Sequence, residues 1–147
     1  MWTGMMAHNN SCGVGRVQDW SSHAIEHELS AQYDCAHGAG LAVVFPAWMR
    51  YVYKNDVMRF AQSAVRVWGC SMDFANPERT AQEGIQRFRN FLTSIGMPAN
   101  FDQLGAKAAD IREMARRCAF GNGRTGVIGG FVQLNEADIT SIYQLML

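Results

Sequence analysis

The sequence predicts an all-α protein, a helical bundle that forms one domain over residues 1–147. Apolar side chains recur at the spacing i, i+3, i+4, i+7 through most of the chain, which is the pattern of amphipathic helices. Only residues 127–134 have the composition of an extended segment, and Gly129 and Gly130 interrupt it. A chain of 147 residues can bury one core and leaves little room for a second.

The first quarter of the chain contains three predicted segments. Residues 1–8 are apolar without a helix-start signal. They are typical either of a helix already under way, as in a chain that begins inside a larger protein, or of a disordered terminus. Residues 20–34 are expected to form a helix with Asp19 as its cap. An apolar helix is expected from His37 through the segment 38–45.

Two helices in the middle of the chain have clear ends. The periodic pattern from Val57 to Trp68 predicts a helix that stops at Gly69. The next helix is expected to begin with Asn76 as its cap. Its first turn contains Pro77, where a missing N–H costs nothing, and it ends at Gly96.

Two more helices are expected in the last third. Residues 108–119 place Ile111, Met114 and Cys118 on one face. The final helix is expected to begin at Asn135, because Asp138 three positions later completes a variant of the capping box.

Composition excludes several classes of protein. The 13 basic and 13 acidic side chains balance, and no polybasic tract exists, so we expect no nucleic-acid partner. The most apolar run, residues 39–49, is shorter than the roughly 18–20 residues that cross a bilayer, and no secretory signal is visible, so no membrane partner is expected. The four cysteines are widely spaced without a C-x-x-C motif, which favours reduced thiols in a cytoplasmic protein.

All four histidines lie in the first quarter of the chain, and three of them have a suggestive spacing. His23 and His27 are four residues apart on a predicted helix, so both imidazoles project from one face. His37 follows at the start of the next helix, where the helix dipole disfavours the imidazolium and leaves the neutral, metal-binding form. The three rings can converge on one cation, although such a pair is also typical of hydrogen-bonded histidines. His8 has no spacing relation to them and is interpreted as structural or exposed.

Two short motifs match known signatures without their context. Residues 23–27 match H-x-x-E-H, the inverted zinc-peptidase motif in which the glutamate is the general base. That site needs a third protein ligand and a substrate cleft, and the chain is short for it. Residues 121–126 match G-x-G-x-x-G, but they follow a helix rather than a strand. This motif is therefore interpreted as a flexible connection and not as a dinucleotide site.

A longer stretch, from Asp19 through His23, His27 and His37 to Pro46, resembles the metal-binding region of iron-containing (group III) alcohol dehydrogenases, closest to their butanol-dehydrogenase-like branch. The H-x₃-H-x₉-H spacing matches in full, and so does the His-Gly pair before an apolar helix. The similarity continues to Leu147, including Gly-Gly-Phe131 and the closing helix.

The resemblance implies a function. Family members transfer hydride between NAD(P)H and a small alcohol or aldehyde, and a divalent metal, Fe²⁺ or Zn²⁺, polarises the substrate oxygen. Of the family's four metal ligands, one aspartate and three histidines, the last two fall on His23 and His37. His27 matches a histidine near the nicotinamide, where it is a catalytic candidate for proton transfer. Glu26 has no ligand role in that pattern.

The resemblance also implies what this chain lacks. The family's first two metal ligands and its N-terminal nucleotide-binding domain lie upstream of the matched region. Residues 1–147 are therefore expected to be the all-helical C-terminal domain of a dehydroquinate-synthase-like, iron-alcohol-dehydrogenase architecture, inactive as a dehydrogenase alone and part of a homo-oligomer. The alternative is a stand-alone helical binding or oligomerisation domain with a vestigial metal site.

Overall fold

The computed structural model describes residues 1–147 and is mostly helical, which confirms the predicted fold class. Two 3₁₀ turns, 53–56 and 108–110, precede helices. The elements are α1 Trp2–His8, α2 Ser21–Tyr33, α3 His37–Val52, α4 Val57–Trp68, α5 Pro77–Ser94, α6 Phe101–Leu104, α7 Ile111–Phe120, β1 Val127–Ile128, β2 Leu134–Asn135 and α8 Glu136–Gln144. The expected extended segment is a small antiparallel hairpin, in which Val127 pairs with Asn135 and Ile128 with Leu134.

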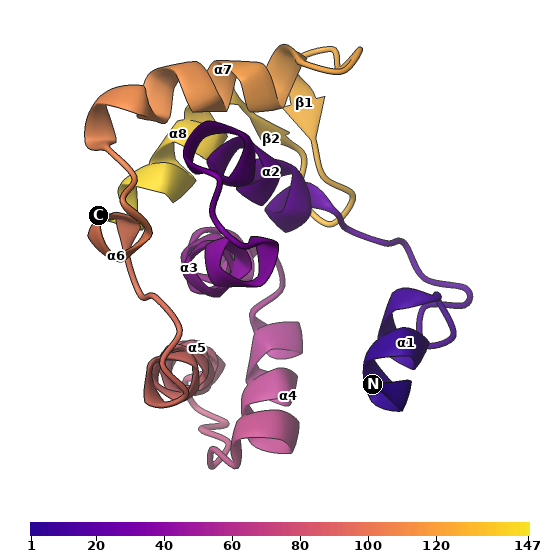
Figure 1. Ribbon diagram of the computed structural model, residues 1–147. Coiled ribbons are helices and arrows are strands. Elements are labelled where there is room, and N and C mark those ends of the chain that lie inside the picture. The colour runs from indigo at the N-terminus through magenta and orange to yellow at the C-terminus, as the bar shows by residue number, and fades with distance from the viewer.

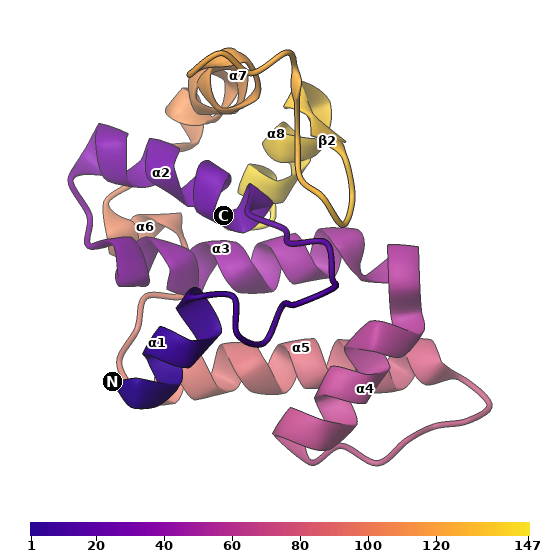
Figure 2. The same ribbon diagram turned by 90° about the vertical axis from the view of Figure 1, so that its right-hand side faces the viewer.

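Helix α3 runs through the middle of the molecule (Figures 1 and 2). Helices α2, α7 and α8 with the hairpin lie on one side of it, and α4 and α5 lie on the other. The central position explains why residues 39–49 are so apolar, since α3 buries residues from Gly40 to Val52 against both groups. Pro46 lies inside α3 without ending it. No helix of the structure is both long enough and apolar enough to cross a membrane.

The predicted helix ends agree with the structure to within a few residues. Helix α4 has the bounds expected from the periodic pattern, and Gly69 follows it with a left-handed backbone, φ 64°. Helix α8 begins with the predicted capping box. The side-chain oxygen of Asn135 accepts a hydrogen bond from the backbone N–H of Asp138, and the backbone N–H of Asn135 donates to the carboxylate of Asp138. Helix α2 begins one residue later than expected, with Trp20 at the N-cap position.

Helix α1 is formed, which favours the helical interpretation of the first residues over a disordered terminus. None of its residues is buried. Its last residue, His8, lies edge-on to Trp20, which directly precedes α2, with ring centroids 5.9 Å apart. The N-terminal helix is therefore attached to the surface rather than to the core.

Polar contacts of Tyr143 and Arg117 fix helix α2 to the C-terminal helices. The buried hydroxyl of Tyr143 on α8 donates to the carbonyl oxygen of Ile25 at 2.7 Å. Arg117 on α7 pairs with Glu28 at 2.9 Å. The apolar side of α2, including Ile25 and Leu29, is fully buried in the core. This packing leaves the opposite side of α2, with His23 and His27, facing outward.

Candidate metal centre

All four histidines line one hollow on the surface, with a volume of about 830 Å³. Its walls are the start of α2, the start of α3 and the segment 127–130 after α7. His8 is exposed, and the structure adds that it also lines this hollow. The other lining residues are Gln18, Trp20, Ser21, Ala24, Leu41 and Arg124.

His23 and His37 approach each other across the hollow. Nδ1 of His23 lies 3.2 Å from Nε2 of His37. Two imidazole nitrogens that bind one zinc ion tetrahedrally at about 2.0–2.1 Å are separated by about 3.3 Å. The observed distance also fits a hydrogen bond between two neutral rings, so both interpretations of the sequence share this geometry. The donor set and its spacing fit a divalent metal.

His27 lies one turn after His23 and lines the same hollow. Its ring centroid is 5.3 Å from that of His37, the same separation as between His23 and His37. The side chain is exposed. The prediction that His23 and His27 share one face of the helix is therefore confirmed, and His27 is accessible to a molecule in the hollow.

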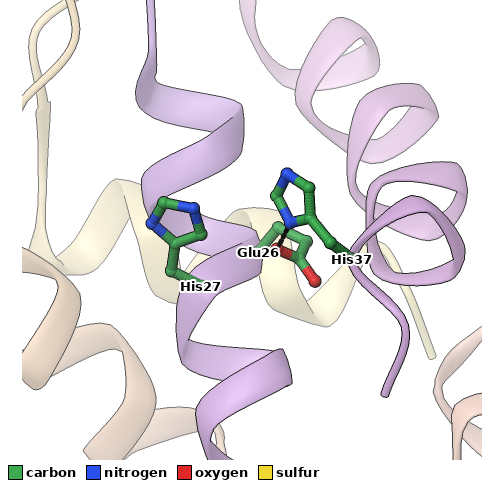
Figure 3. A group of neighbouring side chains, drawn as sticks. All are labelled: Glu26, His27 and His37. Carbon is green, nitrogen blue, oxygen red and sulfur yellow. Dashed lines mark hydrogen bonds and ion pairs between the residues drawn. The ribbon is translucent and has the colours of Figure 1, made fainter. Parts of the chain in front are cut away.

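Glu26 occupies the interior side of the same helix turn. Its side chain is fully buried, and one carboxylate oxygen is paired with Nδ1 of His37 (Figure 3). The other oxygen accepts a hydrogen bond from the hydroxyl of Ser30. The pairing with His37 gave no signal in the sequence, because helical spacing relates Glu26 to His23 and Ser30 but not to a residue on the next helix.

A second set of possible donors is Glu26, His27 and His37, whose ligand atoms lie within 4.8 Å of one another. This set differs from the pair expected from the family resemblance. Glu26 is the weaker candidate, because both of its oxygens already have partners and it does not reach the hollow. The ring of His23, by contrast, has a hydrogen-bond partner only in His37. His23 and His37 are thus the two histidines whose ring nitrogens approach each other at the hollow.

The electrostatic environment keeps His23 neutral. Partial burial lowers the pKa of His23, and the neighbouring His37 and His27 lower it further, while Glu26 opposes the shift. A lowered pKa means that the ring is uncharged at neutral pH with a nitrogen lone pair available. Neutral imidazole is the form that binds metals.

Asp19 connects two walls of the hollow. One carboxylate oxygen accepts from the backbone N–H and the hydroxyl of Ser21, and the other accepts from the N–H groups of Gly130 and Phe131 at 2.8 and 2.7 Å. Burial alone would raise the pKa of Asp19, but these hydrogen bonds outweigh it and hold the pKa below its ordinary value. The predicted cap, Asp19, therefore lies one residue before the observed N-cap Trp20 and bonds to the first residue of α2. It also holds the segment after β1, which the sequence did not indicate.

Comparison with known proteins decides the family. The sequence profile described as "Fe-containing alcohol dehydrogenase family, C-terminal" matches residues 1–147. The chain belongs to this family. The predicted resemblance to iron-containing alcohol dehydrogenases is therefore confirmed.

Relatives in the family are much longer than this chain. NADH-dependent butanol dehydrogenase A of Clostridium acetobutylicum is 34% identical over 145 residues, which cover 98% of this chain and 36% of that protein. Probable NADH-dependent butanol dehydrogenase 1 of Bacillus subtilis is 35% identical over 147 residues, which cover all of this chain and 37% of that protein. This chain therefore spans just over a third of the length of the relatives it matches.

Solved structures of the family share the fold. NADH-dependent butanol dehydrogenase A of Thermotoga maritima superposes with a TM-score of 0.90 at 34% identity, over 99% of this chain and 37% of that one. YqhD of Escherichia coli gives a TM-score of 0.90 at 26% identity, over all of this chain and 37% of that one. The all-helical prediction is thus supported by the fold of iron-type alcohol dehydrogenases as well as by the helices themselves.

Within this family fold, the two short motifs keep the interpretations given above. Glu26 of the H-x-x-E-H match points to the interior and pairs with His37, so it does not face the hollow as a peptidase general base would. The G-x-G-x-x-G match forms turns between α7 and β1 and does not follow a strand. Arg124 within that match lines the hollow, a role that the sequence did not reveal.

Proposed function

We propose that this chain is the all-helical, metal-binding C-terminal domain of an NAD(P)-dependent alcohol dehydrogenase or aldehyde reductase. The observation that carries the proposal is the 3.2 Å separation of Nδ1 of His23 and Nε2 of His37 at a hollow shared with His27. Relatives named NADH-dependent butanol dehydrogenase and NADPH-dependent aldehyde reductase support small alcohols and aldehydes as the substrate class.

In this proposal His23 and His37 hold a divalent metal, Fe²⁺ or Zn²⁺. A bound metal supplies a Lewis acid that polarises a carbonyl or alcohol oxygen. The neutral state of His23 suits this task, because a metal and a proton compete for the same lone pair. Both metals accept imidazole ligands.

His27 is proposed to exchange a proton with substrate or water in the hollow. It is exposed, lines the hollow and lies one helical turn from His23. An imidazole has one nitrogen that donates and one that accepts a proton, which suits a general acid or base. His27 would then act on the reacting atoms without binding the metal.

We expect residues 1–147 alone to bind metal weakly and to show no dehydrogenase activity. The family resemblance assigns two further metal ligands and the nucleotide-binding domain to upstream segments, and two imidazoles complete only half of a tetrahedral shell. Turnover of NADH with butanal by the purified chain, lost in His23→Ala, would contradict this expectation.

The metal site itself is tested by titrating the chain with Zn²⁺ in a calorimeter. The wild type is expected to bind one equivalent, and His23→Ala and His37→Ala are each expected to lose it. His8→Ala is the matched control, because His8 lines the same hollow but forms no hydrogen bond to another histidine. Equal binding by all four proteins would exclude His23 and His37 as ligands.

A second candidate function is self-association of a helical domain. Large apolar side chains are exposed on α4 and α5, among them Met58 at 54%, Val67 at 65% and Phe91 at 47%. Where such side chains form one contiguous patch, they mark an interface between subunits. Analytical ultracentrifugation over a wide concentration range tests this candidate, and a monomer at every concentration would exclude it.

A further inference from the structure

Glu26 is a buried acid that the proposed metal site does not use as a ligand. Its side chain is fully buried, at 0% exposure, among the apolar residues of α2. An ionised carboxylate removed from water is costly unless hydrogen bonds and an opposite charge or dipole compensate. Both oxygens are compensated here, one by Nδ1 of His37 and one by the hydroxyl of Ser30.

The contact with Glu26 determines which nitrogen of His37 is free. A carboxylate, when ionised, only accepts hydrogen bonds, so its partner Nδ1 of His37 must then be the donor. In the neutral ring the lone pair then lies on Nε2. That atom is the one 3.2 Å from Nδ1 of His23. The buried acid therefore lies behind His37, and the free nitrogen lies in front of it, toward the hollow.

Gly40 makes this arrangement sterically possible. A Cβ atom at position 40 would lie 2.2 Å from Oε1 and 2.7 Å from Cγ of Glu26. Gly40 is itself buried on α3, one turn after His37 begins that helix. The first turn of α3 can thus lie directly against the carboxylate only because residue 40 has no side chain. Glu26, His37 and Gly40 form one packed unit.

We propose that Glu26 is a positioning residue that holds His37 with Nδ1 protonated and Nε2 directed toward the metal. This inference rests on the proposed function, because the metal is the one assigned to His23 and His37. A carboxylate behind a metal-binding imidazole fixes the ring and raises its basicity, and loss of such a partner weakens metal binding by about 10–100-fold.

The first test reads the tautomer of His37 in the metal-free chain. Two-bond ¹H–¹⁵N correlation spectra of ¹⁵N-histidine-labelled protein distinguish a protonated Nδ1 from a protonated Nε2. The wild type is expected to show His37 with Nδ1 protonated. Glu26→Leu is expected to shift His37 toward the Nε2-protonated form, and Glu26→Gln, which keeps an acceptor oxygen, is expected to retain part of the wild-type signal.

Two further variants distinguish a specific effect on the position of His37 from a general loss of structure. Gly40→Ala keeps every polar group but displaces the Glu26 carboxylate, so it is expected to shift the His37 signal in the same direction as Glu26→Leu. Glu28→Leu, whose carboxylate pairs with Arg117 instead, is the matched control and is expected to leave His37 unchanged. Circular dichroism checks that each variant folds. If Glu26→Leu does not fold, the His37 signals of Glu26→Gln and Gly40→Ala test the positioning role instead.

The second test measures Zn²⁺ affinity of the same variants. Glu26→Leu and Gly40→Ala are expected to bind zinc about 10–100-fold more weakly than the wild type. The affinity of Glu26→Gln is expected to lie between that of the wild type and that of these two variants. If His37 has the expected tautomer but the wild type binds no zinc, the metal proposal fails and the positioning of His37 stands. If zinc binds through His23 and His37 but the variants change neither tautomer nor affinity, the positioning role is overturned.

Discussion

The hydroxyl of Tyr143 donates a 2.7 Å hydrogen bond to the carbonyl oxygen of Ile25, a residue 118 positions earlier in the chain. This bond joins the last helix to the helix that carries His23 and His27. It is fully buried, and burial raises the pKa of Tyr143 well above its ordinary value. The C-terminal helix therefore helps to set the position of α2 and of the histidines on it.

Removing this hydroxyl is expected to destabilise the fold. Tyr143→Phe leaves the ring in place and loses one buried hydrogen bond, for which we expect a loss of about 0.5–1.5 kcal/mol in the free energy of unfolding. Urea denaturation followed by circular dichroism measures this loss. Tyr51→Phe is the control, because the Tyr51 hydroxyl bonds to Asp138 at a part-buried site. A larger effect at Tyr51 than at Tyr143 would contradict the expectation.

Asp19 is expected to make stability depend on pH in the acid range. Its folded pKa lies below its ordinary value, so its contribution is present above the unfolded pKa of about 3.9 and is lost as the pH falls through the folded pKa. Asp19→Asn is expected to cost about 1–2 kcal/mol at pH 7 and to flatten this part of the profile. Denaturation midpoints between pH 2 and 7 measure both effects.

The control for Asp19 is Asp34→Asn. Asp34 is exposed and ends α2 with a left-handed backbone, φ 50°, which asparagine also adopts readily. We expect this variant to keep the wild-type stability at pH 7. An Asp19→Asn profile parallel to that of Asp34→Asn would show that the four hydrogen bonds of Asp19 contribute nothing.

The crossing of α4 and α5 is expected to tolerate no side chain at Gly84. A Cβ atom there would lie 2.3 Å from Cβ and 2.7 Å from Cα of Ala64, so Gly84→Ala must push the two helices apart. We expect a loss of about 1–3 kcal/mol in the free energy of unfolding. Gly4→Ala is the matched control, because a Cβ at Gly4 on α1 meets nothing within 4 Å. Thermal melts of both variants test this difference.

The cysteines are expected to differ sharply in reactivity. Burial raises the pKa of Cys118 to about 12, and burial likewise raises the pKa of Cys70, while Cys12 is exposed. Because the thiolate is the reactive form, Cys12 should react rapidly with a thiol reagent at pH 8, and Cys118 only after unfolding. Mass spectrometry of timed labelling identifies each site. Fast labelling of Cys118 in the folded chain would contradict the structure.

Sequence patterns predicted the local features of this fold well. The bounds of α4, the capping box of α8 and the shared face of His23 and His27 all depend on residues within about one helical turn. Such features need no knowledge of the tertiary structure. The family resemblance supplied the metal and cofactor expectations, which the local patterns alone left open.

Contacts between distant residues were not predictable in the same way. Asp19 bonds to Gly130 and Phe131, more than 100 positions away, and the sequence near Asp19 indicated only a helix start. The inward orientation of Glu26 depends on how α3 packs against α2. A single sequence does not encode such pairs as a spacing, so they emerged only from the structure.

The central claim is that His23 and His37 bind the metal and that His27 does not. X-ray absorption at the zinc edge of the zinc-loaded chain, compared with its His27→Ala variant, tests it most directly. Two imidazole ligands in both proteins, with zinc–nitrogen distances of about 2.0–2.1 Å, are the predicted result. Loss of an imidazole in His27→Ala, or a zinc shell with no imidazole in the wild type, would contradict the claim.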